Sequence, residues 1–353
     1  MKFIHIADVH FDAPFTVLNS RGLADERRLE QRSAFKQVID YIKENSIPYL
    51  FISGDLFENE YVKNSTIEYI NKLFLTISDT KIFIVPGNHD PYLKNSYYSK
   101  YSFPENVKIF TSELEKIEDG EINIYGYGFD DFYMKSNQKN IQIEDKSKIN
   151  ILITHCDLDG AKNNDIRYNP VSKTMLHSLG FDYVALGHIH KRMQDGEIVY
   201  PGSLVSLGFD ELGQHGMILG EIDESTKELS LNFISVDEKE FEEQEIDISD
   251  IFSQEELIEV INNMYFPDDR YIKIVLIGNK KMEIEPLKIL KFINIPNVIK
   301  VKDLSKLEIN LSEIAKQNNL RGIFVRTLLE KIEREPENRK KIEKAIEIGI
   351  TAF

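Results

Sequence analysis

The sequence predicts a large α/β domain followed by a smaller module in which helices and strands also mix. Short apolar strands alternate with helical patterns as far as residue 235, and this alternation is typical of an α/β sheet. The length of 353 residues exceeds the ~100–200 residues of a usual domain, so a second unit is expected. With 42% hydrophobic and 29% charged residues, the composition excludes a disordered, collagen-like or coiled-coil protein.

The elements of the large domain follow from hydrophobic periodicity. Phe35, Val38, Ile39 and Ile42 share one face of a helix predicted over 31–45, and a second helix is expected over 64–78. Predicted strands occupy residues 2–7, 49–53, 81–85, 121–126, 149–154, 183–186, 198–200, 217–221 and 229–234. In the second half of this domain, the short spacing between predicted strands is typical of hairpins.

A strongly acidic stretch follows the last of these strands. Between Asp237 and Glu256, ten acidic residues stand against one basic residue, Lys239. We expect residues 1–235 to form the first domain and residues 236–256 a solvated linker. Helices predicted at 254–263 and 286–292 and strands at 271–277 and 298–302 then indicate a small module over 257–310. Residues 311–353 are predicted to be a helical tail.

Charge and composition limit the partners and the compartment. The net charge of −16 at first argues against nucleic acid, but much of it lies in the acidic stretch, so the remainder is only mildly acidic. No apolar run approaches the ~20 residues of a membrane span, and Asp8 interrupts the N-terminal apolar segment too early for a signal peptide. The single cysteine, Cys156, cannot form an intrachain disulfide. We therefore expect a soluble, cytoplasmic protein with no membrane partner.

Polar side chains gather at the carboxyl ends of the predicted strands, where an α/β sheet opens its ligand crevice. The five motifs are Asp8-Val9-His10, Ser53-Gly54-Asp55, Gly87-Asn88-His89-Asp90, Thr154-His155 and Gly187-His188-Ile189-His190. In an extended segment, residues two apart project to the same side, so Asp8 and His10 are expected to converge on one ion.

The donor types favour a binuclear metal site. Imidazole, carboxylate and amide donors suit manganese, iron or zinc, and a single catalytic zinc needs only three protein ligands. Asp55 is the candidate to bridge two ions. One histidine at a strand end is more often structural, but five such ends in one domain favour a site. We expect the remaining histidines and the cysteine to be structural: His5, His177, His215 and Cys156.

In this order, the motifs resemble those of the calcineurin-like metallophosphoesterases, over about residues 1–235. The run from Ala7 to Phe15 is similar to bacterial DNA-repair exonucleases of the SbcD and YhaO type, and Gly322–Arg326 is similar to the end of YhaO-like chains. The resemblance implies a four-layer α/β/β/α sandwich, followed by a small α+β capping domain over 257–310 and the helical tail.

The resemblance also implies roles for the motif residues. It gives one metal to Asp8, His10 and His190. The second metal falls to Asn88, His155 and His188, with Asp55 bridging both ions and His89 as the catalytic residue. The expected cofactor is a pair of divalent ions, Mn²⁺ in the first place, with iron, zinc or magnesium as alternatives. Such ions would ready a water to attack phosphorus, and His89 would protonate the leaving oxygen.

The function implied is that of a manganese-dependent phosphodiesterase and exonuclease acting on DNA. Its expected partners are DNA and an SMC-like ABC ATPase bound through the tail, with a homodimer also possible. Glu58 stands where SbcD-like enzymes carry a histidine, and this departure predicts weak or differently directed nuclease activity. The alternatives are a phosphomonoesterase or cyclic-nucleotide phosphodiesterase of the same superfamily, or a non-catalytic scaffold that binds DNA ends or the ATPase.

Four tyrosines follow the His89 motif and leave two interpretations open. With Lys94 and Lys100 nearby, they either stack on bases or pack the loop onto the sandwich; they are Tyr92, Tyr97, Tyr98 and Tyr101. Lys191 and Arg192 are better placed to meet neighbouring phosphates. Asp12 and Asp90 either orient an imidazole or are exposed carboxylates.

Overall fold

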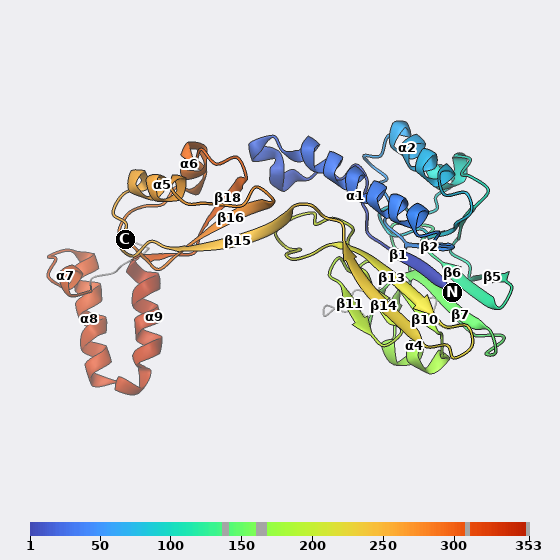
Figure 1. The fold of residues 1–353 in the computed structure, drawn as a ribbon. Coiled ribbons are helices and arrows are strands. Elements are labelled where there is room, and N and C mark those ends of the chain that lie inside the picture. Colours follow the sequence, from blue (N-terminus) through green and yellow to red (C-terminus); the bar gives the residue numbers. More distant parts are fainter. Residues whose placement is uncertain (136–140, 160–167, 308–310, 351–353) are drawn as a thin grey trace. The chain divides into compact units, whose positions relative to one another are not determined.

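The computed structural model describes residues 1–135, 141–159, 168–307 and 311–350. The chain divides into two compact units (Figure 1). Unit 1 comprises Met1–Glu243 and Phe266–Lys273, and unit 2 comprises Gln244–Tyr265 and Ile274–Phe353. The predicted motifs all belong to unit 1.

Unit 1 contains a six-stranded sheet in the order β14-β13-β1-β2-β3-β4. Its strands are β1 (Lys2–Ile6), β2 (Tyr49–Ser53), β3 (Lys81–Val85), β4 (Val107–Ile109), β13 (Gly216–Ile222) and β14 (Leu229–Ser235). Strands β1 to β4 pair in parallel, whereas β13 and β14 are antiparallel. The parallel part brings the carboxyl ends of β1, β2 and β3 to one edge, as the motifs require.

A second six-stranded sheet has the order β11-β12-β10-β7-β6-β5. Its strands are β5 (Glu115–Asp119), β6 (Ile122–Tyr127), β7 (Ile149–His155), β10 (Tyr183–Gly187), β11 (Met193–Asp195) and β12 (Ile198–Tyr200). The four central strands are parallel, and the antiparallel β5 and β11 lie at the edges. A two-stranded pair, β8 (Asp157–Leu158) and β9 (Pro170–Val171), lies outside it.

The two sheets pack face to face around one apolar core. Phe51 and Phe83 from the first sheet belong to the same buried cluster as Ile151 and Tyr183 from the second. Helices α1 (Ala24–Glu44) and α2 (Asn64–Leu75) lie beside the first sheet in Figure 1. On the outer face of the second sheet, Leu176 of α4 (Lys173–Leu179) joins another cluster. The predicted α/β/β/α sandwich is confirmed.

Unit 2 is a smaller α+β assembly. It contains α5 (Gln254–Asn262), α6 (Pro286–Phe292), β18 (Val298–Asp303) and the short pair β17 (Asn279–Lys280) and β19 (Lys306–Leu307). The helices α7 (Leu311–Ala315), α8 (Leu320–Arg334) and α9 (Arg339–Ile350) follow. Helices α8 and α9 run side by side in Figure 1, and Val325 and Ile346 share their buried cluster.

The stretch expected to be a solvated linker over 236–256 is instead largely ordered. Strand β15 (Glu240–Asp247) fills much of it and pairs in a sheet of the order β15-β16-β18, in which β16 is Arg270–Ile277. The reason is charge pairing across the strands, because Arg270 lies 3.5 Å from Glu242 and Lys273 pairs with Glu243. Three acids of the run, Glu240, Glu242 and Glu243, therefore form ion pairs with basic residues of β16. The domain limits themselves stay a prediction.

Helix α1 begins at Ala24 rather than at the predicted residue 31. Its first turns bury a charged residue, Arg27, so apolar periodicity could not reveal them. The guanidinium forks onto Asp237 with distances of 2.8 and 2.7 Å and donates to the carbonyl of Ser206. A buried cation is tolerated because its donors meet a buried carboxylate and a carbonyl oxygen.

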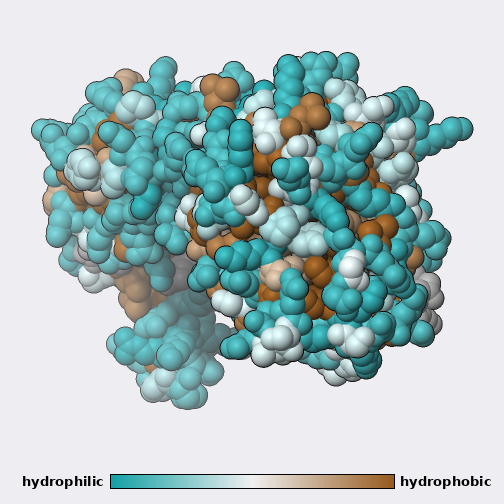
Figure 2. Space-filling model, turned by 45° about the vertical axis from the view of Figure 1, so that its right-hand side comes forward, coloured by the Kyte–Doolittle hydropathy of each residue, from teal (hydrophilic) through white to brown (hydrophobic). Residues whose placement is uncertain are grey.

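Hydrophilic residues predominate on the surface seen in Figure 2, where apolar residues form only small groups. Among the described residues, no helix combines the length and the apolar character that crossing a membrane requires.

A buried histidine joins the two sheets. The imidazole of His5 in β1 lies 2.8 Å from the Tyr183 hydroxyl and 2.9 Å from the Ser53 hydroxyl. Because Ser53 donates its own proton to the carbonyl of Ala185, Nε2 of His5 donates and Nδ1 accepts from Tyr183. Burial lowers the pKa of His5 to about 3, against an upward contribution from the Leu186 backbone. As expected from the sequence, this histidine is structural.

The neutral His5 predicts acid sensitivity of the fold. Its pKa in the folded chain is about 3, below the ordinary 6.5, so the unfolded chain takes up a proton first as the pH falls. The free energy of unfolding should drop by roughly 1.4 kcal/mol per pH unit from this group alone, between about pH 6 and pH 4. Urea unfolding of chelator-treated protein at several pH values gives the free energy of unfolding as a function of pH. In the His5→Gln variant this free energy should fall less steeply with pH, by that amount. Equal slopes in both proteins would contradict this account.

Candidate metal centre

The Asp8-Val9-His10 motif lies just beyond a strand rather than within one. Strand β1 ends at Ile6, and Asp8 and His10 have φ angles of 50° and 51°. The two side chains therefore converge because the backbone adopts left-handed conformations, not because of a strand's pleat as the sequence analysis expected. Asp55 repeats the feature with a φ of 51°. Such conformations are costly for residues other than glycine, and they persist where surrounding contacts enforce them.

Glycines let the strand ends approach one another closely. A Cβ on Gly54, whose φ is 91°, would lie 2.4 Å from Nδ1 of His155. A Cβ on Gly187 would lie 1.9 Å from the carbonyl oxygen of Ser53. Side chains at these positions would separate β2 from β7 and β10. The glycines of two motifs therefore allow these strand ends to lie close together.

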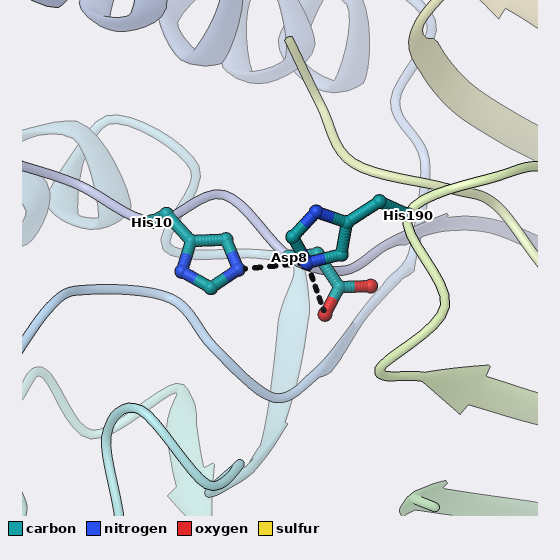
Figure 3. A group of neighbouring side chains, drawn as sticks. All are labelled: Asp8, His10 and His190. Carbon is teal, nitrogen blue, oxygen red and sulfur yellow. Dashed lines mark hydrogen bonds and ion pairs between the residues drawn. The ribbon is translucent and has the colours of Figure 1, made fainter. Parts of the chain in front are cut away.

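One donor group consists of Asp8, His10 and His190 (Figure 3). The Nε2 atoms of His10 and His190 lie 3.1 Å apart, and Nε2 of His190 is 4.0 Å from a carboxylate oxygen of Asp8. Asp8 is fully buried and also accepts from the backbone N–H of His188. The structure thus brings together the three residues predicted to hold the first ion.

The second donor group surrounds Asn88. Its side-chain oxygen lies 3.0 Å from Nε2 of His155 and 3.1 Å from Nδ1 of His188. The carboxylate of Asp55 lies between the two groups, 3.3 Å from Nε2 of His155 and 3.7 Å from Nε2 of His10. This is the place expected of a bridging carboxylate, although the individual ligand roles stay a prediction.

Acceptors behind three of the imidazoles fix the direction of their lone pairs. Nδ1 of His10 lies 2.8 Å from Glu58, Nδ1 of His190 lies 2.6 Å from Glu211, and Nδ1 of His155 lies 2.9 Å from the carbonyl of Ser53. An ionised carboxylate or a carbonyl can only accept, so each Nδ1 donates its proton. In the neutral imidazoles, each Nε2 then presents a lone pair to the cluster.

Glu58 also binds the predicted catalytic residue. Its second carboxylate oxygen lies 3.0 Å from Nδ1 of His89, and the backbone N–H of His89 donates to Asp55. Burial raises the pKa of Glu58, but the hydrogen bonds from His10 and His89 outweigh it and lower the pKa to about 2. Burial likewise lowers the pKa of His89, but Glu58 and the charge of Asp55 raise it to about 9.

The residues present fit a pair of divalent cations. When both imidazoles are neutral, their Nε2 atoms 3.1 Å apart place lone pairs beside the buried carboxylates of Asp8 and Asp55, so that donors and negative charge face one point. Imidazole, carboxylate and amide oxygen form a donor set of intermediate hardness. The thiol of Cys156 is no competitor, because burial raises its pKa to about 12.

Comparison with known proteins gives the class. The sequence model of the family described as calcineurin-like phosphoesterase matches residues 1–192, and the chain belongs to this family. It is therefore a metal-dependent phosphoester hydrolase by family, and the family's divalent metals suit the donor groups described above.

Individual relatives are distant. The chain is 24% identical over 280 residues to the protein named "Uncharacterized metallophosphoesterase YhaO" of Bacillus subtilis (strain 168), covering 75% of this chain and 67% of that protein. Among solved structures, TT1561 of Thermus thermophilus shares 12% identity and a TM-score of 0.36, covering 67% of this chain and 98% of that one. The 5′-nucleotidase of Candida albicans SC5314 shares 14% identity and a TM-score of 0.37, with coverages of 67% and 52%.

Several other sequence expectations are resolved by contacts. Asp90 orients no imidazole among the described residues; it accepts from the backbone of Asp55, Leu56 and Gly87 and from the Tyr98 hydroxyl. Asp12 receives bonds from Lys63, Thr66 and Arg32. Tyr98 is buried, while Tyr97 and Tyr101 line a cavity of about 560 Å³ that includes none of the predicted ligands. The loop-packing interpretation therefore holds for Tyr98.

Sequence reasoning missed Glu211 entirely. Besides His190, its carboxylate accepts from the Ser203 hydroxyl and the Leu207 N–H, each at 3.0 Å. His215, expected to be structural, donates from Nε2 toward the Glu211 carbonyl at 2.9 Å and so supports the same loop. Nothing in the local sequence marks this acid, since it lies 21 residues from the histidine that it orients.

Replacing Glu211 should weaken metal binding. In Glu211→Gln, the imidazole of His190 loses a charged acceptor, and affinity for one Mn²⁺ in a calorimetric titration should fall by about 10- to 100-fold. A matched control is Glu197→Gln, because Glu197 makes a similar 2.8 Å contact with Nδ1 of His177 on the surface. The control should bind both ions normally, and unchanged affinity in a folded Glu211→Gln protein would refute the positioning role.

Proposed function

We propose that this chain is a manganese-dependent phosphodiesterase that cleaves DNA, acting as a nuclease subunit of the SbcD and YhaO type. The observation that carries the proposal is a pair of open pockets on the donor groups. One, of about 740 Å³, is lined by His188 and His190, and the other, of about 460 Å³, by Asn88 and His89. A phosphodiester has two ester substituents and needs room on both, whereas a monoester needs room on one.

The larger pocket favours a polyanionic substrate. Lys191 and Arg192 line it directly after the His188 motif, where they can contact phosphates that flank the scissile one. The guanidinium of Arg192 lies 4.2 Å from the ring centroid of Phe233, which restricts its orientation. These two cations stand beside two acids of the same lining, Asp210 and Glu211, so the basic contacts for phosphate are local to Lys191 and Arg192.

The chemistry follows from the roles that the side chains can take. Two divalent ions held by Asp8, His10, His190, Asn88, His155, His188 and the bridging Asp55 would supply an activated water and neutralise charge on the phosphate. His89, kept as a cation by Glu58 and Asp55, donates a proton to the leaving oxygen. Glu58 holds both His10 and His89, so it couples the position of the proton donor to that of a metal-binding residue.

The helical tail supports a proposed partner, an SMC-like ABC ATPase. Helices α8 and α9 bury their own core, yet Leu320, Ile323 and Ile348 remain exposed. Exposed apolar side chains on a helical pair are suited to a coiled-coil partner. The resemblance also supports a proposed homodimer through unit 1, and DNA is the proposed substrate.

A substrate panel tests the proposed function. With Mn²⁺, the chain should hydrolyse bis-p-nitrophenyl phosphate and DNA at least 10-fold faster than p-nitrophenyl phosphate. His89→Ala should lower kcat by about 10²- to 10⁴-fold while calorimetry still detects two ions. A preference for the monoester would favour a phosphomonoesterase. Absence of turnover on every substrate, with metals bound, would favour the non-catalytic scaffold.

Placing charge on the exposed apolar positions of the tail tests the partner. The triple variant Leu320→Glu, Ile323→Glu and Ile348→Glu should lose co-purification with the ATPase, because desolvating three carboxylates opposes apolar contact. Hydrolysis of bis-p-nitrophenyl phosphate serves as the control and should not change. Retention of the ATPase by this variant would exclude the exposed apolar residues as the docking surface.

A further inference from the structure

Four aromatic side chains share the smaller pocket with the predicted proton donor. Tyr61, Phe132, Tyr133 and Tyr168 line it together with His89. They come from separate loops, after β2, after β6 and before β9, so only the folded chain assembles them. None of them belongs to the tyrosine cluster that the sequence analysis considered for base stacking.

The aromatic group begins at the donor residues. The ring of Tyr168 lies beside the imidazole of His188, with centroids 5.1 Å apart and planes inclined by 31°. Tyr133 continues from it, with ring centroids 5.9 Å apart. A substituent on the phosphorus side nearest Asn88 and His89 would therefore meet aromatic faces directly.

These rings are exposed, and the charged residues around them are mostly acids. Tyr61, Phe132 and Tyr133 are 50%, 39% and 54% exposed, although such rings are usually buried more deeply. The described lining contains two acids, Glu58 and Glu60, and neither lysine nor arginine, whereas the larger pocket pairs its acids Asp210 and Glu211 with Lys191 and Arg192. Beyond the phosphate held at Asn88 and His89, the aromatic faces of the described lining suit an uncharged planar group, and Glu58 and Glu60 disfavour a second phosphate.

We propose that this aromatic pocket, defined by Tyr61, Phe132, Tyr133 and Tyr168, is a stacking subsite for the nucleobase of the nucleotide that leaves when the ester is cleaved. The assignment to the leaving side follows from His89, which lines the same pocket and donates its proton to the leaving oxygen. The inference rests on the proposed phosphodiesterase function and specifies its substrate. Stacking on aromatic faces tolerates any base, so the subsite selects for a nucleoside and not for a sequence.

A binding test needs neither metal nor turnover. The chain contains no tryptophan, so Tyr133→Trp introduces a single indole in the pocket. In chelator, the dinucleotide d(TpT) should quench its emission, whereas analogues lacking the base on the leaving nucleoside should not. Tyr41→Trp, on α1 and outside the lining residues, should be quenched by neither. Equal quenching by the baseless analogue, or none by d(TpT), would overturn the proposal.

A kinetic test identifies the side. Two abasic versions of d(TpT), one for each nucleoside, should differ: removing the base from the nucleoside released as an alcohol should lower kcat/KM at least about fivefold, and removing the other should not. This preference should vanish in Phe132→Leu and Tyr133→Leu and persist in the control Tyr41→Leu. A preference that survives both pocket variants, or equal effects of the two abasic sites, would refute the subsite. If the wild-type chain cleaves no diester, the proposed function is refuted. The quenching experiment then still tests whether the aromatic pocket binds a base.

Discussion

The centre depends on hydrogen-bond acceptors placed behind its imidazoles. Glu58, Glu211 and the carbonyl of Ser53 each receive an Nδ1 proton, and this leaves three Nε2 atoms directed at the same small volume. Without these acceptors, either ring nitrogen could carry the proton and the rings could rotate. The lone pairs would then no longer converge beside the buried carboxylates.

The arrangement carries a conformational cost that the sandwich core offsets. Asp8, His10 and Asp55 hold left-handed backbone conformations, which are unfavourable for such residues. They follow strands β1 and β2, whose side chains are almost completely buried, and Asp90 binds the backbone of Asp55 and Leu56. Rigid strands and a buried carboxylate thus impose geometries that an isolated loop would not keep.

The two pockets at the donor groups differ in chemistry, so each suits a different part of a substrate. The larger pocket offers two cationic side chains, Lys191 and Arg192, beside the acids Asp210 and Glu211, whereas the described lining of the aromatic pocket offers rings and acids without lysine or arginine. A nucleic acid offers both an anionic backbone and planar bases, so one substrate can satisfy both environments.

The sequence by itself determined an α/β pattern and the motifs at its strand ends, and the resemblance carried by those motifs implied the sandwich. Strands such as Tyr49–Ser53 and Lys81–Val85 were predicted with their observed limits, because hydrophobic periodicity is a local property. The motifs could be recognised because each follows a predicted strand. Parallel strands bring their carboxyl ends to a common edge, so the motif residues were expected to meet there. Tertiary structure alone decided that Glu211 orients His190, that Arg27 begins a helix by binding Asp237, and that four scattered aromatic residues form one pocket. Those features depend on partners distant along the chain, and neither periodicity nor spacing records which distant residue will supply a hydrogen bond or a neighbouring ring.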